Sequence, residues 1–132
     1  MLQDYLEKLC KELAIATPKL NEQKSYKLMF ASDAVHIQNL DPGCSMHAHI
    51  CEAPQKRKEE LYTYLMRANL LGQGTGLTRI GMDEDEKFLT LSMGLPYELN
   101  YQTFREMFED FVNYLIYWRE EVTKLMSEER LY

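Results

Sequence analysis

The sequence lacks the features of a membrane-spanning or exported protein. It contains no run of about 18 apolar residues, the length at which a membrane-spanning helix is expected. The N-terminus has no basic stretch followed by an apolar block, so no secretory signal is expected. Cysteine is scarce, with 3 in 132 residues, and the spacing fits no disulfide framework. These absences predict reduced thiols and a cytoplasmic protein with no membrane partner.

Patterns typical of enzymes are also missing. Neither a Gly-x-Ser-x-Gly nucleophile turn nor a His-Glu-x-x-His metal motif occurs in the chain. A cysteine–histidine dyad, such as Cys51 with His36, stays open because such pairs depend on placement in space, which one sequence does not reveal. No pattern favours that dyad, so we expect no enzyme activity, no catalytic residue and no cofactor.

Two loops share composition with known ligand sites but not their context. Residues 72–76 are glycine-rich, yet a phosphate-binding loop needs a strand before it and a helix after it. Here a helix is predicted before the loop and a strand after it, and no Lys-Ser or Lys-Thr pair closes it. Residues 83–86 are all acidic, but they lack the glycine and the distal glutamate of a calcium-binding loop. We expect a connector and a solvated hairpin turn.

One group of residues has the chemistry of metal ligands. Cys44, His47, His49 and Cys51 lie close in sequence, and the last three share one face of a predicted strand. Three such ligands can converge on zinc. Cys44 has the opposite parity, and the paired Cys-x-x-Cys spacing is absent. The sequence therefore favours a polar, solvent-facing strand face, and we predict no metal.

Acidic residues concentrate near the C-terminus. The net charge of the chain is −6, but residues 83–132 hold 12 Asp and Glu against 5 Lys and Arg, whereas residues 1–82 are nearly neutral. Nucleic acid needs cations to neutralise its phosphates, so no nucleic-acid partner is expected. An acidic region suits a neutral or basic polypeptide partner.

The first half of the chain switches from a helical to a strand period. Leucines at three- and four-residue spacing predict a helix over residues 2–15, and Pro18 stops it. Period-two alternation within residues 25–51 predicts three strands with one buried face. The first two strands are divided near Ser32, and the turn residues 41–43, Asp-Pro-Gly, divide the second from the third.

The second half repeats the alternation of periods. An apolar stripe predicts a helix over residues 54–71, with Pro54 at its first position. Residues 77–82 and 87–93 predict two strands joined as a hairpin. Asn100 is a predicted N-cap, after which apolar residues at helical spacing predict a long final helix.

The predicted element order, α-β-β-β-α-β-β-α, indicates the fold class. Helices mixed with antiparallel strands predict one two-layer α+β domain over residues 1–132, with a twisted antiparallel sheet. A five-stranded sheet in so small a domain leaves edge strands, which can accept a strand from a partner. The chain also contains 8 methionines, whose flexible side chains suit adaptable contact surfaces.

The most specific motif extends over residues 65–76. It runs Leu-Met-Arg-Ala-Asn-Leu-Leu-Gly-Gln-Gly-Thr-Gly and resembles the L-x-x-A-N-L-L-G-x-G-T-G run of the class I type III secretion chaperones, the Tir-chaperone family. The following strand, residues 77–82, is similar to the family, as are residues 94–96, Gly-Leu-Pro, and the Trp118-Arg119 pair of the final helix. The resemblance extends to about residue 126 and includes the element order.

The resemblance implies a non-enzymatic bacterial protein that works as a dimer. Two protomers would pair through the second helix and the strand after the glycine-rich connector. The residues expected at this dimer interface are Leu61, Leu65, Ala68, Leu77 and Ile80.

The resemblance also implies a surface for a secreted partner. Apolar patches on the first helix and the sheet would hold the N-terminal segment of one or a few secreted effector or gatekeeper proteins, keeping it non-globular and secretion-competent without ATP. A disordered segment can bind in this way by adding strand hydrogen bonds and placing apolar side chains in grooves. The residues expected to bind the effector are Leu2, Leu6, Leu9, Leu13, Leu28, Phe30, Val35 and Ile37.

The resemblance leaves the partners open in two respects. The dimer can be a homodimer or a heterodimer with a second class I chaperone. A regulatory function is the alternative, in which the protein couples secretion to transcription by binding a regulator or a component of RNA polymerase.

Overall fold

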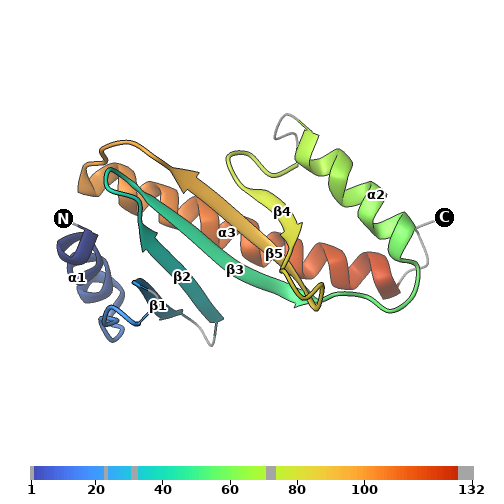
Figure 1. Cartoon of the computed structure of the whole chain (residues 1–132), viewed down its shortest axis with the longest axis horizontal. Helices are drawn as coiled ribbons and strands as arrows, with labels where there is room; N and C mark the ends of the chain where they lie inside the picture. The colour runs from blue at the N-terminus through green and yellow to red at the C-terminus, as the bar shows by residue number, and fades with distance from the viewer. Residues whose placement is uncertain (1, 23, 31–32, 71–73, 128–132) are drawn as a thin grey trace. The chain divides into compact units, whose positions relative to one another are not determined.

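The computed structural model describes residues 2–22, 24–30, 33–70 and 74–127 (Figure 1). Among these residues, the helices and strands follow the predicted order, which confirms the α+β fold class. The elements are α1 (Leu2–Leu13), β1 (Ser25–Phe30), β2 (Asp33–Asn39), β3 (Cys44–Glu52), α2 (Lys58–Asn69), β4 (Arg79–Met82), β5 (Phe88–Leu95) and α3 (Tyr101–Ser127).

The strands form one sheet in the order β1-β2-β3-β5-β4. β1 and β2, β2 and β3, and β4 and β5 pair antiparallel. The register places Leu28 opposite Val35, and Ile37 opposite both Tyr26 on one side and Met46 on the other. These side chains are all buried, so the predicted alternation gives the sheet one apolar face.

The helices bury the apolar stripes that predicted them. α1 buries Leu2, Leu6, Leu9 and Cys10 on one side. α3 begins as predicted at the N-cap Asn100, whose Oδ1 accepts a hydrogen bond from the Thr103 amide at 2.8 Å. The buried residues of α3 recur at spacings of mostly three and four: Phe104, Phe108, Phe111, Val112, Leu115, Trp118, Val122 and Leu125.

The chain divides into two compact units. Unit 1 consists of residues 1–48 and 93–110, and unit 2 consists of residues 49–92 and 111–132. β3, β5 and α3 each run through both units. Each unit has its own core: α1 and the first half of α3 contribute to that of unit 1, and α2 and the second half of α3 to that of unit 2.

α2 begins four residues later than predicted. The sequence places Pro54 at the first helical position, whereas the helix starts at Lys58. The Ala53 amide still donates to the Lys87 carbonyl oxygen at 2.8 Å, so the chain continues as an extension of the sheet at this point. Arg57 then adopts a left-handed conformation with φ of 59°, and the helix starts after it.

Two strand boundaries also differ from the prediction. β4 starts at Arg79 rather than at residue 77, because the Thr78 amide donates to the Thr75 carbonyl oxygen at 3.0 Å and forms a turn. β5 continues through Gly94 to Leu95, so Pro96, and not Gly94, marks its end. α2 ends at Asn69, whereas the prediction extends to residue 71, which lies outside the described residues.

Candidate partner-binding surfaces

Most of the predicted effector-binding residues lie inside unit 1. Leu6, Leu28 and Ile37 are 0% exposed, and Leu2, Leu9 and Val35 are also buried. Phe30 is partly buried and meets the Phe108 ring edge-on, with 6.2 Å between the ring centroids. Leu13 at the end of α1 is the member of the set that is clearly exposed, at 37%. α1 therefore buries most of its leucines in the core of unit 1. Its role in binding an effector stays a prediction.

Other apolar side chains of unit 1 do reach the surface. They lie after α1, on the outer side of β1, at the start of the β2–β3 turn and after β5. These residues are Leu20, Met29, Leu40 and Tyr97. A partner that contacts unit 1 in this conformation meets these side chains and Leu13 rather than the buried leucines.

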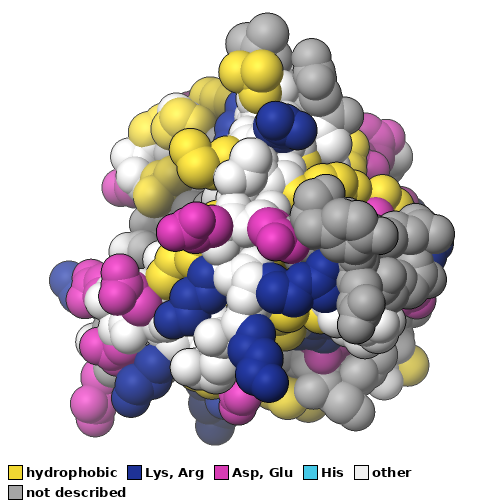
Figure 2. All heavy atoms as spheres, turned by 90° about the vertical axis from the view of Figure 1, so that its right-hand side faces the viewer, with side chains coloured by type: hydrophobic (Ala, Val, Ile, Leu, Met, Phe, Trp, Pro, Cys, Tyr) yellow, Lys and Arg dark blue, Asp and Glu magenta, His cyan; other side chains and the backbone are white. Residues whose placement is uncertain are grey.

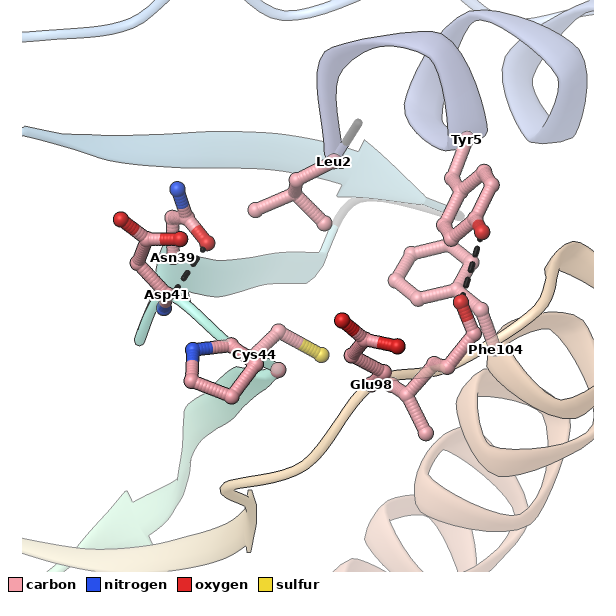
Figure 3. Close-up of a pocket in the computed structure, with 10 residues that line it drawn as sticks. Leu2, Tyr5, Asn39, Asp41, Cys44, Glu98 and Phe104 are labelled. Atoms are coloured by element: carbon pink, nitrogen blue, oxygen red, sulfur yellow. Dashed lines mark hydrogen bonds between the residues drawn. The ribbon is translucent and has the colours of Figure 1, made fainter.

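Unit 1 also contains a cavity of about 170 Å³ (Figure 3). Its walls come from three segments far apart in sequence: the start of α1, the β2–β3 turn, and the stretch from β5 into α3. The Tyr5 hydroxyl donates to the Leu99 carbonyl oxygen at 2.6 Å, which ties α1 to the stretch before α3. The sequence offers no signal for the cavity, because its walls meet only through the fold.

Gly43 holds the β2–β3 turn against the chain that follows β5. Its φ is +90°, and a Cβ at this position would lie 1.8 Å from the Leu95 carbonyl oxygen. Glycine is therefore the residue that fits both the conformation and the space. The predicted turn at residues 41–43 is confirmed, and it forms one wall of the cavity.

The thiol of Cys44 also faces this cavity. The residue is almost fully buried, and burial raises the pKa of the Cys44 thiol to about 11. The thiol is protonated at neutral pH, so Cys44 acts as a small apolar lining group of the cavity. Among the described residues, no three His, Cys, Asp or Glu side chains gather in a group that could hold a metal ion.

The predicted dimer-interface residues divide into buried and exposed positions within unit 2. Leu61, Leu65 and Ile80 are buried within the single chain, and Ala68 is partly exposed. Leu77 is 60% exposed. Of the five, Leu77 thus offers most surface to a second protomer, whereas three of the others belong to the core of unit 2.

The exposed apolar residues of α2, β4 and the chain between them form what we call the α2–β4 surface. Its members are Met66, Leu70, Leu77 and Met82. Figure 2 shows the face of the molecule on the side of α2, where apolar side chains are interspersed with charged side chains of both signs. A mixed surface of this kind, with Met66 72% exposed, suits contact with another protein.

Asn69 joins α2 to β4. Its side-chain amide donates to the Ile80 carbonyl oxygen, and its Oδ1 accepts from the Ile80 amide, both at 2.8 Å. The asparagine thus occupies the place that a neighbouring strand would take along the edge strand β4. This pair of hydrogen bonds gives a physical reason for the asparagine in the Leu65–Gly76 motif.

The glycine at position 74 makes a second contact of that motif. Its amide donates to the Ala68 carbonyl oxygen at 2.9 Å, and its carbonyl oxygen accepts from the Trp118 indole nitrogen at 3.1 Å. A Cβ at this position would lie 3.0 Å from that of Ala68, so a larger residue would crowd the helix. The described part of the predicted connector is therefore packed against α2 and Trp118.

α3 anchors the end of β3 within unit 2. The Arg119 guanidinium donates to the His49 and Ile50 carbonyl oxygens at 2.6 and 3.2 Å. His49 itself stacks on Phe88 with ring centroids 4.3 Å apart. Burial raises the pKa of the nearby Cys51 thiol, and the Arg119 charge partly opposes that rise. The exposed His49 side chain thus stacks on a ring of the neighbouring strand, and the backbone at this point is held by Arg119.

A comparison with known protein families identifies the family of this chain. The model of the Tir chaperone protein (CesT) family matches residues 4–119. The chain belongs to this family. The match includes both units and the 65–76 motif, which confirms the resemblance seen in the sequence. The matched family is a family of chaperones. No curated protein gives a significant sequence match.

Solved structures share the fold of this family member. It is similar to a chain of the HopA1–SchA chaperone–effector complex, with a TM-score of 0.69 and 13% identity, over 90% of this chain and 93% of that one. It is also similar to a chain in the structure of the Yersinia pestis type III secretion chaperone SycH with a fragment of YscM2, with a TM-score of 0.61 and 16% identity over 89% and 99%.

A third solved structure has the same fold but is not that of a secretion chaperone by its name. YbjN from E. coli, a suggested transcription regulator, matches with a TM-score of 0.67 and 14% identity, over 93% of this chain and 92% of that one. Identities this low show a shared fold alone. In the described part of this chaperone, no helix has the length and apolar content to cross a membrane.

Proposed function

We propose that this chaperone binds the N-terminal segment of one or a few secreted effector or gatekeeper proteins of a type III secretion system. It keeps that segment non-globular and ready for secretion, and it does so without ATP. Membership of the Tir chaperone family over residues 4–119 is the observation on which the proposal rests. The client is held before export, so we place the protein in the bacterial cytoplasm.

The surface of unit 1 supports a role in binding an extended chain. β1 is an edge strand of the sheet, and in the described part of the chain its outer side carries the isolated bridge between Leu20 and Tyr26. An extended segment can add hydrogen bonds along such an edge and place side chains on apolar residues beside it. Leu13, Leu20 and Met29 supply exposed apolar area on α1, β1 and the chain between them.

The α2–β4 surface supports pairing with a second protomer. We propose that Leu77 and its neighbours Met66 and Leu70 face the second copy, or a second class I chaperone in a heterodimer. Leu61, Leu65 and Ile80 are buried within the single chain and belong to the core of unit 2. This assignment keeps the predicted elements but moves the contact to their exposed side chains.

Affinity capture from a native lysate, read by mass spectrometry, tests the function. We expect a secreted protein that is still captured as its first ~100 residues alone, as for segments that fold on binding, and that is lost when those residues are removed. Leu13→Asp should weaken capture because it places a charge on the unit 1 surface, whereas Ile116→Asp on unit 2, with similar exposure, serves as the matched control. Capture that is independent of the N-terminal segment would contradict the proposal.

The fold shared with YbjN is the observation that favours the regulatory alternative. Under that alternative the captured proteins would be a transcription regulator or RNA polymerase components, without any secreted client. The acidic region after residue 83 would then suit a basic surface on such a partner. The same capture experiment therefore separates the two functions.

A further inference from the structure

We propose that the cavity of unit 1 is a specificity pocket for an arginine side chain of the bound client segment. This inference rests on the proposed function, since it names the kind of side chain that the segment inserts. None of the predicted effector-binding residues except Leu2 lines this cavity. The proposal therefore adds a site to the surface that the family resemblance implies.

The inner part of the cavity is apolar. Leu2, Leu99 and Phe104 line it, together with the protonated Cys44 thiol and the Tyr5 ring. Leu2, Leu99 and Phe104 are all buried, so the apolar wall is fixed by the core of unit 1. An aliphatic stem of three methylene groups can bury its surface against such a wall while its polar end stays at the opening.

Two carboxylates give the cavity its charge. Asp41 and Glu98 line it from different segments, and no Lys or Arg is among its lining residues. In the part of the chain that the structure describes, neither carboxylate forms an ion pair or a side-chain hydrogen bond. In Figure 3 the Glu98 carboxylate points toward the space between Leu2 and the Cys44 sulfur.

Two exposed carboxylates elsewhere in unit 1, those of Glu12 and Glu109, pair with the same arginine. Arg105 lies 3.4 Å from Glu12 and 3.2 Å from Glu109, so its charge is shared between those two residues. The two cavity carboxylates therefore remain available to a cation from outside. Both carboxylates are exposed, so a cation can reach them directly from solvent.

Arginine fits this combination better than a purely apolar residue or lysine. Its planar guanidinium presents five donors and bonds a carboxylate through two of them, whereas an ammonium acts as a single point of charge. A norleucine-like side chain would fill the apolar part but leave both carboxylates without a partner. The pocket thus selects for an apolar stem that ends in a forked cation.

Binding of capped tripeptides tests the pocket without any client. The probes are Ala-X-Ala, where X is arginine, its uncharged analogue citrulline, or norleucine, and binding is followed by NMR shifts of backbone amides in the full chain. We expect the arginine peptide to shift the amides of Tyr5, Cys44 and Leu99. We also expect it to bind about tenfold tighter than the citrulline peptide, the difference that one charged hydrogen bond makes.

A pair of double variants locates the effect. D41N/E98Q should remove the tenfold preference, and Asn at position 41 suits its φ of 45°. The control D85N/E84Q removes the same charge from the β4–β5 turn and should keep the preference. Norleucine binding as tightly as arginine, equal loss in both variants, or no shift with any peptide would each overturn the proposal. Failure to capture a client would instead count against the proposed function.

Discussion

At the scale of single residues, the fold depends on a few backbone contacts that other side chains cannot reproduce. Gly43 is one of them, since both its φ of +90° and the 1.8 Å approach to Leu95 exclude a Cβ. Asn69 is another, because its amide matches the donor and the acceptor of one β4 residue. Each contact joins segments that are distant in sequence, and each makes a prediction about stability.

Replacing Gly43 with alanine should lower the free energy of unfolding by roughly 2–3 kcal/mol, the cost of forcing a side chain into a left-handed and crowded position. Urea denaturation followed by circular dichroism measures this. Gly94→Ala is the matched control, because a Cβ there meets nothing within 4 Å, and its effect should stay within about 1 kcal/mol. Equal effects of the two substitutions would show that the turn is not held as described.

Replacing Asn69 with alanine should cost roughly 2 kcal/mol, because the Ile80 amide and carbonyl groups lose their partners together. The same denaturation measurement applies. Asn113→Ala on the exposed side of α3 provides the control and should change stability little. A neutral result at position 69 would mean that β4 is held to α2 by other contacts.

At the scale of elements, the periodicity of apolar residues predicted every helix and strand. The leucines of α1, the alternation in β1 to β3 and the N-cap at Asn100 act locally, so their sequence signals survive in the structure. The start of α2 was predicted wrongly because the left-handed Arg57 and the hydrogen bond from Ala53 to Lys87 depend on tertiary contacts. The cavity of unit 1 was missed for the same reason.

Residues of one predicted apolar stripe differ in how far they are buried in the structure. Leu6 and Leu13 belong to the same predicted stripe, yet one is 0% and the other 37% exposed. In α2, Leu65 is buried whereas its neighbour Met66 points outward. A stripe predicts which side of a helix is apolar, but it does not predict which residues remain for a partner after the core is filled.

The β4–β5 turn makes a pH prediction at this scale. Hydrogen bonds from the Phe88 and Lys87 amides hold the pKa of Asp83 below its usual value. A carboxyl with a lowered pKa in the folded state stabilises the fold above its ordinary pKa, and that contribution is lost as the pH falls through the lowered one. Acid should therefore destabilise the wild type through this turn.

Asp83→Asn should remove this dependence. Melting temperatures measured from about pH 5 downward should fall less steeply for the variant than for the wild type, since the amide does not titrate. Asp85→Asn is the control from the same turn and should retain the wild-type profile. Identical profiles for all three proteins would show that the Asp83 hydrogen bonds do not stabilise the folded state.

At the scale of the whole molecule, we propose that unit 2 pairs with a second protomer and that unit 1 binds the client. Leu77→Glu should convert the dimer to a monomer, because the charge would lie in the protomer contact without a partner. Light scattering gives the mass, and circular dichroism should remain native because Leu77 is 60% exposed. Met29→Glu, which charges an exposed apolar position of unit 1, should leave the dimer intact.

A substitution at Leu65 answers a different question. This residue is buried within the single chain, so a charge there should unfold unit 2 as well as prevent pairing. If Leu77→Glu leaves a dimer of unchanged mass, the α2–β4 surface is not where the protomers meet.

The central claim is that this chaperone holds an unfolded N-terminal segment by binding alone. The most direct measurement is calorimetric titration of the purified N-terminal segment of the captured client into the protein, with no nucleotide present. We expect saturable binding with a negative heat-capacity change, as is observed when a disordered segment buries apolar surface. Binding that requires ATP, or that occurs with the folded remainder of the client but not with the segment, would contradict it.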